Sequence, residues 1–280
     1  MTTTPAPDVD DAPRYTFDNS HDQEGKRLLS LLSAILDEHH SIDVLTRVGV
    51  TRGWRCLDLG PGAGTITHWL AKKVGPSGHV TALDLDPRHV KPAPNVTVVA
   101  GDVRTLGLEQ AHYDVVHARL VLLHIPEREK VLDRLISALK PGGVLVVSDW
   151  DATHDDMLLE APTETAREAF TAYQNALRAT LRANGADLGW AWRAPLAMRS
   201  AQLVDVTAEE HTRLWAGGEP GCLLHESNSR QLEGALLTHG VTAEQLRVLR
   251  EAMHDPKTLA YCYRMYTTVG YQPKGYRPQA

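Results

Sequence analysis

The sequence predicts an α/β protein built on an open, mostly parallel β-sheet with helices on both faces. Between residues 55 and 150, short apolar runs alternate with amphipathic helical segments, which is the pattern of parallel strands joined by helical crossovers. The first of these runs leads directly into a glycine-rich turn. With 280 residues, 42% of them hydrophobic, the chain can form one large domain or one domain with a substantial addition.

The sequence before the glycine-rich turn predicts a disordered segment followed by a packed helix. We expect the first dozen residues, MTTTPAPDVDDA, to be disordered because they are polar and proline-rich. From Gln23 onward, apolar side chains recur at helical spacing, at Leu28, Leu31, Leu32 and Ile35. This segment therefore packs one apolar stripe against the rest of the protein.

The stretch CLDLGPGAG, residues 56–64, predicts a nucleotide-type binding loop. Gly60, Gly62 and Gly64 alternate between an apolar strand and a helix that starts at Thr65, so a ligand can lie against bare backbone. The helix points its unpaired amide groups and the positive end of its dipole at the ligand. That end suits a carboxylate or a phosphate.

The spacing of the glycines differs from the dinucleotide fingerprint GxGxxG. Asp58 stands two residues before the first glycine, where a carboxylate repels a pyrophosphate but can hold an ammonium group. The second strand, His79–Asp84, ends twenty residues after Gly64, where the Asp84 carboxylate can accept hydrogen bonds from both ribose hydroxyls. The predicted ligand is therefore adenosine joined to an amino acid.

Four motifs in this order resemble those of the class I S-adenosylmethionine-dependent methyltransferases. CLDLGPGAG resembles the first motif of that family, ALDLD its acidic ribose-binding loop, AGDV its adenine loop and YDVVHARLVLLHIP its following strand, so the resemblance covers residues 54–150 closely. It implies a Rossmann-like sheet of seven strands, S-adenosyl-L-methionine as cofactor and S-adenosyl-L-homocysteine as product. No closely spaced acidic and histidine cluster is present in the sequence, so no metal is expected. The residues that the resemblance places at the cofactor are Tyr15, Asp58, Gly60, Gly62, Gly64, Thr65, Asp84, Leu85, Asp102, Val103, Ala118 and Arg119.

Several of these roles follow from the resemblance and have alternatives. Asp102 would accept from the adenine amino group with Val103 against the ring, or else be a solvated loop carboxylate. Arg119 would pair with the carboxylate of the methionine part. Tyr15 would close over the cofactor, or else Tyr15 and Phe17 would pin the first helix to the core.

Five strands are predicted in the nucleotide-binding half. The carboxyl ends of parallel strands form the usual binding edge of an open sheet, so the loops that follow them carry the site. A helix over residues 127–139, stopped by Lys-Pro-Gly-Gly, belongs to the scaffold. The strands are Arg55–Leu59, His79–Asp84, Val96–Ala100, Tyr113–His117 and Val144–Asp149.

After the fifth strand the simple alternation is lost. Phe170, Tyr173, Leu177 and Leu181 form a helical stripe that ends at Asn184-Gly185, and a loop then brings two tryptophans, Trp190 and Trp192, together. By the resemblance this insertion is a helical lid over a hydrophobic or aromatic substrate. A dimer interface or an ordinary core remains the alternative, so a homodimer stays open.

The end of the chain predicts two more strands, over residues 201–211 and 258–270, with an extra helical pair between them over residues 219–256. A capping box at Thr242 and Gln245 starts the second of these helices. The predicted organisation is a flexible segment over residues 1–20, a cofactor-binding core over 21–150, a helical lid over 151–200 and a closing hairpin with inserted helices over 201–280.

The mechanism that the resemblance implies is in-line displacement at the sulfonium methyl group by an oxygen, nitrogen or carbon of the substrate. A general base is needed only if the acceptor must lose its proton early. The candidates are His124, Asp151, His154 and Tyr173, and the sequence does not choose among them. His124 is equally a cofactor neighbour or a wall residue. His211 and His225 are further possibilities if the sixth-strand region folds over the site.

Composition and missing motifs narrow the function. The formal charge of -6 argues against nucleic acid as substrate, three widely spaced cysteines predict neither disulfides nor a metal site, and no apolar run is long enough to cross a bilayer. We therefore expect a cytoplasmic protein. The position after the fourth strand carries HARL rather than the Pro-Pro-aromatic motif of enzymes that methylate amino groups of adenine or glutamine.

The interpretation that remains is a methyltransferase acting on a small organic acceptor, a specialised natural-product or antibiotic metabolite of a bacterium. Two alternatives stay open. One is a cyclase or rearrangement enzyme that uses the same cofactor and fold. The other is a non-enzymatic protein that binds the cofactor and a partner.

Overall fold

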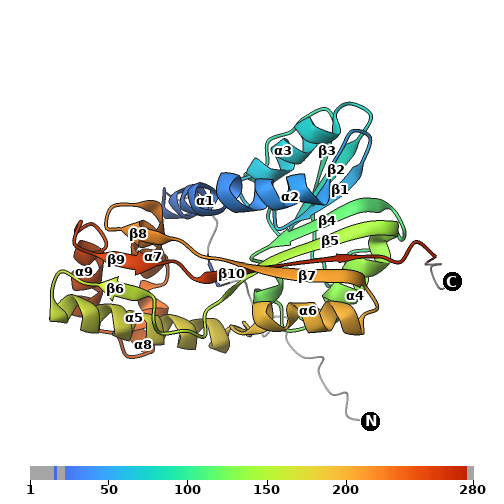
Figure 1. The fold of residues 1–280 in the computed structure, drawn as a ribbon. Helices are drawn as coiled ribbons and strands as arrows, with labels where there is room; N and C mark the ends of the chain where they lie inside the picture. Colours follow the sequence, from blue (N-terminus) through green and yellow to red (C-terminus); the bar gives the residue numbers. More distant parts are fainter. Residues whose placement is uncertain (1–15, 18–22, 276–280) are drawn as a thin grey trace, which may run out of the picture.

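The computed structural model describes residues 16–17 and 23–275, so Tyr15 lies outside the described residues. Its centre is a seven-stranded sheet of order β3-β2-β1-β4-β5-β10-β7 (Figure 1). Strands β1 to β5 are parallel to one another, whereas β10 runs antiparallel to both β5 and β7. The predicted Rossmann-like, mostly parallel sheet is confirmed. The strands are β1 (Arg55–Leu59), β2 (His79–Asp84), β3 (Val96–Ala100), β4 (Tyr113–Arg119), β5 (Leu139–Asp151), β7 (Val204–His211) and β10 (Arg264–Tyr271).

Helices cover both faces of this sheet. On one face, α2 (Ile42–Val48) and α3 (Thr65–Val74) bury a cluster that includes Leu45, Leu70 and Val115. On the other face, α4 (Arg128–Ala138) and α6 (Trp190–Ser200) pack over β4 and β5, with the short 3₁₀ turn η3 (Leu122–His124) beside them. The two cores hold the strands rigidly below their carboxyl ends.

The two tryptophans expected in a loop lie in a helix, α6. Trp190 N–H bonds to the carbonyl oxygen of Asp187 and Gly189 N–H to the Asp187 carboxylate, which starts the helix. Trp190 is 2% exposed in the sheet core, whereas Trp192 is 67% exposed. Because α6 packs on β5, β7 and β10, this part of the predicted lid is a sheet-covering helix.

The segments that follow β5 and β7 come together in space as one body, which we call the helical unit. It consists of α5 (Glu164–Ala183), α7 (Pro220–Gln231), α8 (Glu233–Thr238), α9 (Ala243–Ala252) and a small antiparallel sheet of β6 (Leu158–Glu160), β9 (Leu259–Tyr261) and β8 (Leu214–Ala216). These elements share one hydrophobic cluster. The predicted stripe of α5 is buried in it, and the capping box that starts α9 is present.

Helix α1 (Gln23–Leu36) joins the helical unit to the sheet. Figure 1 shows it between the helical unit, at the left, and α2 beside the sheet. Leu28, Leu31 and Ile35 pack in the cluster of the helical unit, which confirms the predicted apolar stripe. A five-residue π-helical turn, η2 (Asp37–Ser41), then leads into α2. None of the helices in the described ranges is long and apolar enough to span a bilayer.

Candidate cofactor and substrate site

The glycine loop after β1 has the backbone that only glycine adopts easily. Gly60, Gly62 and Gly64 have φ angles of 68°, 53° and 78°, in the left-handed region that disfavours side chains. A Cβ added at Gly60 would lie 2.3 Å from Cγ2 of Val121. The turn after β4 therefore presses against the loop, and both form one continuous surface at the carboxyl edge.

Helix α1 covers the same loop from the other side. A Cβ on Gly62 would lie 3.2 Å from Cδ2 of Leu29, and Ser33 Oγ lies 3.4 Å from Thr65 Oγ1 at the start of α3. The bare backbone of the loop and the N-terminus of α3 are thus bordered by α1 on one side and by Val121 on the other. This arrangement can exclude water from a ligand held on the loop.

Asp58 lies beneath the loop rather than at its surface. The residue is 1% exposed. One carboxylate oxygen accepts from Thr67 Oγ1 at 2.6 Å and the other lies 2.8 Å from His117 Nδ1. Both partners fix the carboxylate under Gly60, so a contact with a ligand ammonium group would use its remaining lone pairs.

Asp84 stands at the tip of β2 beside an exposed apolar side chain. Its Oδ1 accepts from the Asp86 N–H at 3.0 Å, and burial raises the pKa of the Asp84 carboxyl above its usual value. Such a partly desolvated carboxylate gains from further hydrogen-bond donors, as two ribose hydroxyls would supply. The next residue, Leu85, is 61% exposed, which leaves an apolar surface for a flat ring.

Asp102 has an internal partner two residues away. The Arg104 guanidinium forks onto its carboxylate, with Nε at 2.9 Å and Nη2 at 2.7 Å from Oδ2. These bonds hold the pKa of Asp102 below its usual value. Val103 is 5% exposed and packs into the sheet core. The predicted bond from the adenine amino group to Asp102 would therefore compete with Arg104.

Arg119 also has internal partners at the end of β4. Its Nη1 donates to Asp37 Oδ1 and to Ser41 Oγ, both at 2.8 Å. The π-helical turn η2 brings these two side chains over the sheet edge. Arg119 therefore ties η2 to β4, and the neighbouring Ala118 is buried opposite Leu59. The predicted pairing of Arg119 with a cofactor carboxylate would have to share this guanidinium with Asp37.

A row of buried polar groups continues from Arg119 across the sheet. Thr267 Oγ1 on β10 lies 2.8 Å from Ser148 Oγ and 2.6 Å from His40 Nε2. The His40 ring lies 5.2 Å from the ring of His211 and is tilted relative to it by 43°, and burial lowers the His40 pKa to about 3. His40 is therefore neutral at physiological pH, and His211 belongs to this row.

The four predicted base candidates lie in three places. Asp151 and His154 come together after β5, with His154 Nε2 3.6 Å from Asp151 Oδ2. His124 lies in η3, where burial lowers its pKa to about 4 and Phe17 packs edge-on at 6.3 Å. Tyr173 is fully buried in α5, inside the helical unit. The structure thus brings together only one pair of the four candidates.

Asp149 is a residue of this edge that the sequence analysis did not single out. Its Oδ1 accepts from the Val121 N–H at 3.0 Å, and burial raises its pKa to about 8. Leu120, with φ 56°, donates its N–H to the Ser148 carbonyl at 2.8 Å. Asp149 therefore positions Val121 against Gly60. The acidic sequence SDWD at the end of β5 was the available signal.

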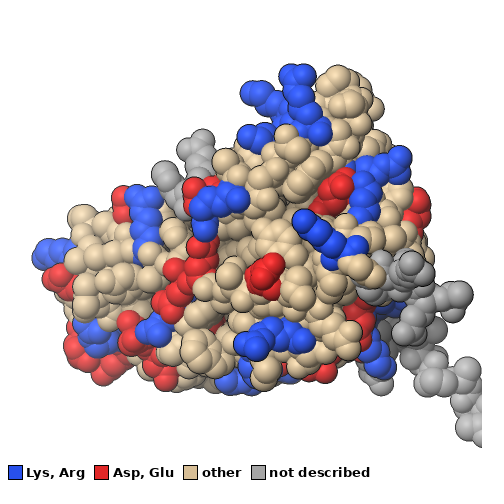
Figure 2. All heavy atoms as spheres, turned by 45° about the vertical axis from the view of Figure 1, so that its right-hand side comes forward, with Lys and Arg blue, Asp and Glu red and all other residues tan. Residues whose placement is uncertain are grey.

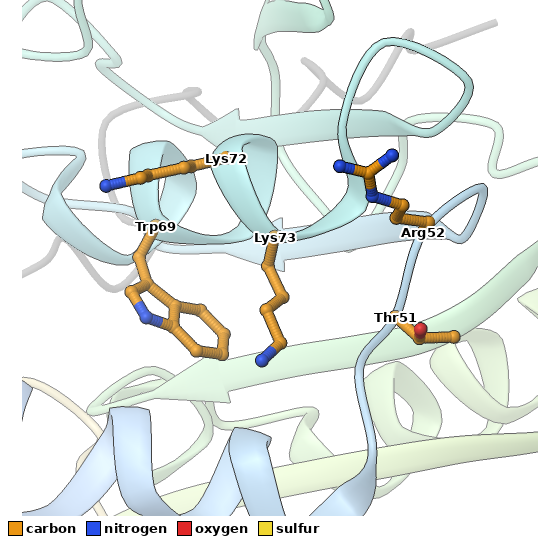
Figure 3. A pocket seen from close by; sticks show the side chains of 5 residues that line it. All are labelled: Thr51, Arg52, Trp69, Lys72 and Lys73. Carbon is orange, nitrogen blue, oxygen red and sulfur yellow. The ribbon is translucent and has the colours of Figure 1, made fainter.

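A separate groove lies at the opposite edge of the sheet. It has a volume of about 530 Å³ and is lined by Thr51, Arg52, Trp69, Lys72 and Lys73 (Figure 3). Lys73 Nζ lies 5.9 Å from the centroid of the Trp69 ring. Figure 2 shows Lys and Arg side chains gathered at the top of the molecule, and both signs of charge interspersed elsewhere on that face. None of the residues that line this groove belongs to the glycine loop.

Residues 51–194, just over half of the chain, match a family model described as a methyltransferase domain. The chain belongs to the methyltransferase domain family. The membership confirms the class I resemblance of the glycine loop and the strands around it. S-adenosyl-L-methionine is the cofactor of that class, and the residues fit it: left-handed glycines, a carboxylate at the tip of β2, the exposed Leu85 and the N-terminus of α3.

Curated relatives resemble only part of this chain. The methyltransferase str2 of Strobilurus tenacellus is 35% identical over 115 residues, 38% of this chain and 39% of that protein. An arsenite methyltransferase of Rattus norvegicus is 29% identical over 164 residues, 52% of this chain and 41% of that protein. The C-methyltransferase UbiE of Ectopseudomonas mendocina is 32% identical over 120 residues, which are 39% of this chain and 47% of that protein. The chain therefore spans less than half the length of these relatives.

A solved structure of similar fold is phosphoethanolamine N-methyltransferase 2 of Haemonchus contortus. In complex with phosphomonomethylethanolamine and S-adenosylhomocysteine it matches with a TM-score of 0.56 at 15% identity, over 90% of this chain and 58% of that chain. Its complex with S-adenosyl-L-methionine gives a TM-score of 0.54 at 16% identity, over 93% of this chain and 60% of that chain. At this identity the match concerns the fold.

Proposed function

We propose that this chain transfers a methyl group from S-adenosyl-L-methionine to a small organic acceptor. The observation that carries the proposal is the loop of three left-handed glycines at the carboxyl edge of a methyltransferase-family sheet, with Asp84 at the next strand tip. When bound, the cofactor supplies a methyl group on a sulfonium sulfur; an oxygen, nitrogen or carbon atom of the acceptor takes this methyl group, and S-adenosyl-L-homocysteine is left.

The chain's own contribution is to bind the two reactants, align them and exclude water from them. The backbone of the glycine loop and the N-terminus of α3 bind the amino-acid end, and Asp84 accepts from the ribose. Leu29 and Val121 wall the loop on two sides, which excludes water. Alignment of two bound reactants is worth roughly 7–11 kcal/mol in favourable intramolecular models, so positioning alone supplies much of the catalysis.

An organic acceptor suits this chain better than a thiophilic one such as arsenite, the substrate in the names of two relatives. Cys222 and Cys262 are buried in the helical unit, and burial raises the pKa of each thiol to about 12. Cys56 is buried under α3 in a different cluster. Soft ions bind thiolates, and these thiols stay protonated at neutral pH. A specialised, natural-product-like metabolite is the acceptor class that we propose.

If the acceptor must lose a proton, the pair formed by Asp151 and His154 is the base that the geometry supports best. Asp151 is held by Thr153, whose N–H and Oγ1 donate at 2.8 and 2.6 Å. The His154 side chain is 38% exposed. Its Nε2 lies beside Asp151 and 3.4 Å from Arg264 Nη1, so Nδ1 is the ring nitrogen that can take a proton from a substrate and pass it to water. A base of this kind typically contributes about a hundredfold to ten-thousandfold.

Calorimetric titration with S-adenosyl-L-methionine, S-adenosyl-L-homocysteine and NAD tests the proposal. We expect micromolar binding of the first two and none of NAD, because the glycine spacing and Asp58 disfavour a pyrophosphate. Release of S-adenosyl-L-homocysteine during turnover with an acceptor would then establish methyl transfer. Failure of both sulfur ligands to bind, or preferential binding of NAD, would refute the proposal.

A further inference from the structure

The interior of the helical unit holds a cluster of aromatic and polar side chains that the proposed cofactor site does not use. The imidazole of His225 lies at its centre, with ring centroids 5.2 Å from Phe170, 5.9 Å from Tyr173 and 5.7 Å from Tyr263. All four rings are buried. Gln174 of α5 and Asn228 of α7 complete the cluster.

One side of this cluster is satisfied by hydrogen bonds. Tyr263 OH donates to Gln174 Oε1 at 3.1 Å, which turns the Gln174 amide nitrogen toward His225 Nδ1 at 3.3 Å. An amide nitrogen is a donor, so His225 Nδ1 accepts and the neutral ring carries its proton on Nε2. The chain of bonds therefore aims the His225 N–H away from Gln174.

The other side of the cluster holds polar atoms that lack a completed hydrogen bond. Tyr173 OH, His225 Nε2 and Asn228 Oδ1 are buried and complete no hydrogen bond within the described part of the chain, although Tyr173 and Asn228 lie near each other. The three residues are 0%, 0% and 3% exposed. Buried polar atoms are paired in most native structures because an unpaired one is costly. Two donors and an acceptor gathered in one place point to a missing polar partner.

The cluster is also uncharged. Burial lowers the His225 pKa to about 4, and burial raises the Tyr173 pKa well above its usual value. Both side chains are therefore neutral throughout the physiological range. A charged ligand would be desolvated here without a counter-charge, whereas an aromatic or apolar body would pack against three aromatic rings.

The cluster adjoins the carboxyl edge of the sheet. Tyr263 packs against Trp150, near the end of β5, with ring centroids 5.3 Å apart. Leu120, which follows β4 directly, contacts both the helical unit and the sheet core. Helix α1 packs against α7, which carries His225, while its Leu29 contacts the glycine loop. Trp150 thus touches the cluster directly, and Leu120 and α1 connect the cofactor edge to the helical unit that holds it.

We propose that this cluster binds the methyl acceptor, an uncharged molecule with an aromatic or other flat apolar body and a hydroxyl or carbonyl group held by Tyr173, His225 and Asn228. The inference rests on the proposed function, since it supplies the second reactant of that same site. Tyr173 and His225 are here binding residues.

Three related probes separate the features of this site: 1-naphthol, which has a hydroxyl, naphthalene, which lacks it, and 1-naphthoate, which is charged. Their binding to the full chain is measured by ligand-observed NMR with and without saturating S-adenosyl-L-homocysteine. We expect 1-naphthol to bind at least fivefold more tightly than the other two. Tyr173→Phe should remove that preference and leave the affinity for naphthalene unchanged.

Tyr113→Phe is the matched control, because Tyr113 is buried at the amino end of β4, and it should bind all three probes as the wild type does. Equal binding of 1-naphthol and naphthalene, absence of 1-naphthol binding, or an unaltered preference in Tyr173→Phe would overturn the inference. Binding of S-adenosyl-L-homocysteine is measured in the same samples by calorimetry. Its failure counts against the proposed function, while the probe comparison still decides this inference.

Discussion

Two tyrosines in the helical unit should respond in opposite ways to the same substitution. The Tyr173 hydroxyl is buried and completes no hydrogen bond within the described residues, whereas the Tyr263 hydroxyl donates to Gln174 Oε1 at 3.1 Å. A buried polar group without a partner costs about 1–3 kcal/mol. Tyr173→Phe removes that cost and leaves only a hydroxyl-sized gap, so we expect the free energy of unfolding to rise by about 1 kcal/mol.

Tyr263→Phe removes a satisfied hydroxyl and leaves the Gln174 oxygen buried without a donor. We expect the free energy of unfolding to fall by about 1–3 kcal/mol, so the two variants should differ by about 2–4 kcal/mol. Urea denaturation of the chain without ligand measures both, and a thermal scan should show about 2–4 °C per kcal/mol. If Tyr173→Phe is destabilised as much as Tyr263→Phe, the Tyr173 hydroxyl has a partner and is not an unpaired group of the cluster around His225.

Three further substitutions test the cofactor edge. Asp84→Ala should weaken binding of S-adenosyl-L-methionine at least tenfold by calorimetry, because the ribose hydroxyls lose their acceptor; unchanged affinity would reject that role. Gly60→Ala should abolish measurable binding, since the added Cβ would lie 2.3 Å from Val121 Cγ2 at a φ of 68°; wild-type affinity would show that the loop can move aside. Asp149 has a folded-state pKa of about 8, above that of an unfolded aspartate, so its favourable contribution is complete at low pH and is lost as pH rises through 8. Asp149→Asn should therefore lose less stability than the wild type between pH 6 and 8, by about 1 kcal/mol per pH unit in urea denaturation, and parallel pH profiles would contradict this.

The nucleotide-binding half of the fold is predictable because its signals are local. The strands β1, β2 and β3 have the predicted bounds, since each is a short apolar run closed by a glycine or an acidic residue. The start of β5 at Leu139 is different. Gly142 N–H bonds to the Gln272 carbonyl and Gln272 N–H to the Gly143 carbonyl, so a partner 130 residues away holds a turn-like sequence in the sheet.

The lid illustrates the same limit at the level of packing. Periodicity located the buried face of α5, because that pattern lies within one helix. It did not indicate that α6 covers the sheet, since Gly189 and Pro195 in its sequence favour a loop and the helix is stabilised by contacts with β5, β7 and β10. Nor did it indicate that the segments after β5 and after β7 share a single core.

The residues of the candidate site also fall into two groups, those that local sequence predicts and those that tertiary contacts decide. The loop glycines and the position of Asp84 follow from spacing alone. Arg104 and Asp102 are two positions apart in the sequence, so the ion pair between them could have been anticipated. The partners of Arg119 could not, because Asp37 reaches it across 82 residues of sequence through a π-helical turn that has no simple pattern. Buried pairs of this kind are decided by tertiary structure, which a local pattern does not encode.

Helix α1 gives a physical reason for joining the cofactor loop and the helical unit in one function. Its Arg27 pairs with Glu226 of α7, and Gln231 of the same helix donates to the Glu24 carbonyl at 3.1 Å. One turn further on, Leu29 contacts Gly62. A displacement of α7 by a ligand beside His225 would therefore act on the helix that walls the glycine loop. Because α1 contacts both α7 and the glycine loop, binding of acceptor and cofactor should be coupled, and the two affinities should change by the same factor.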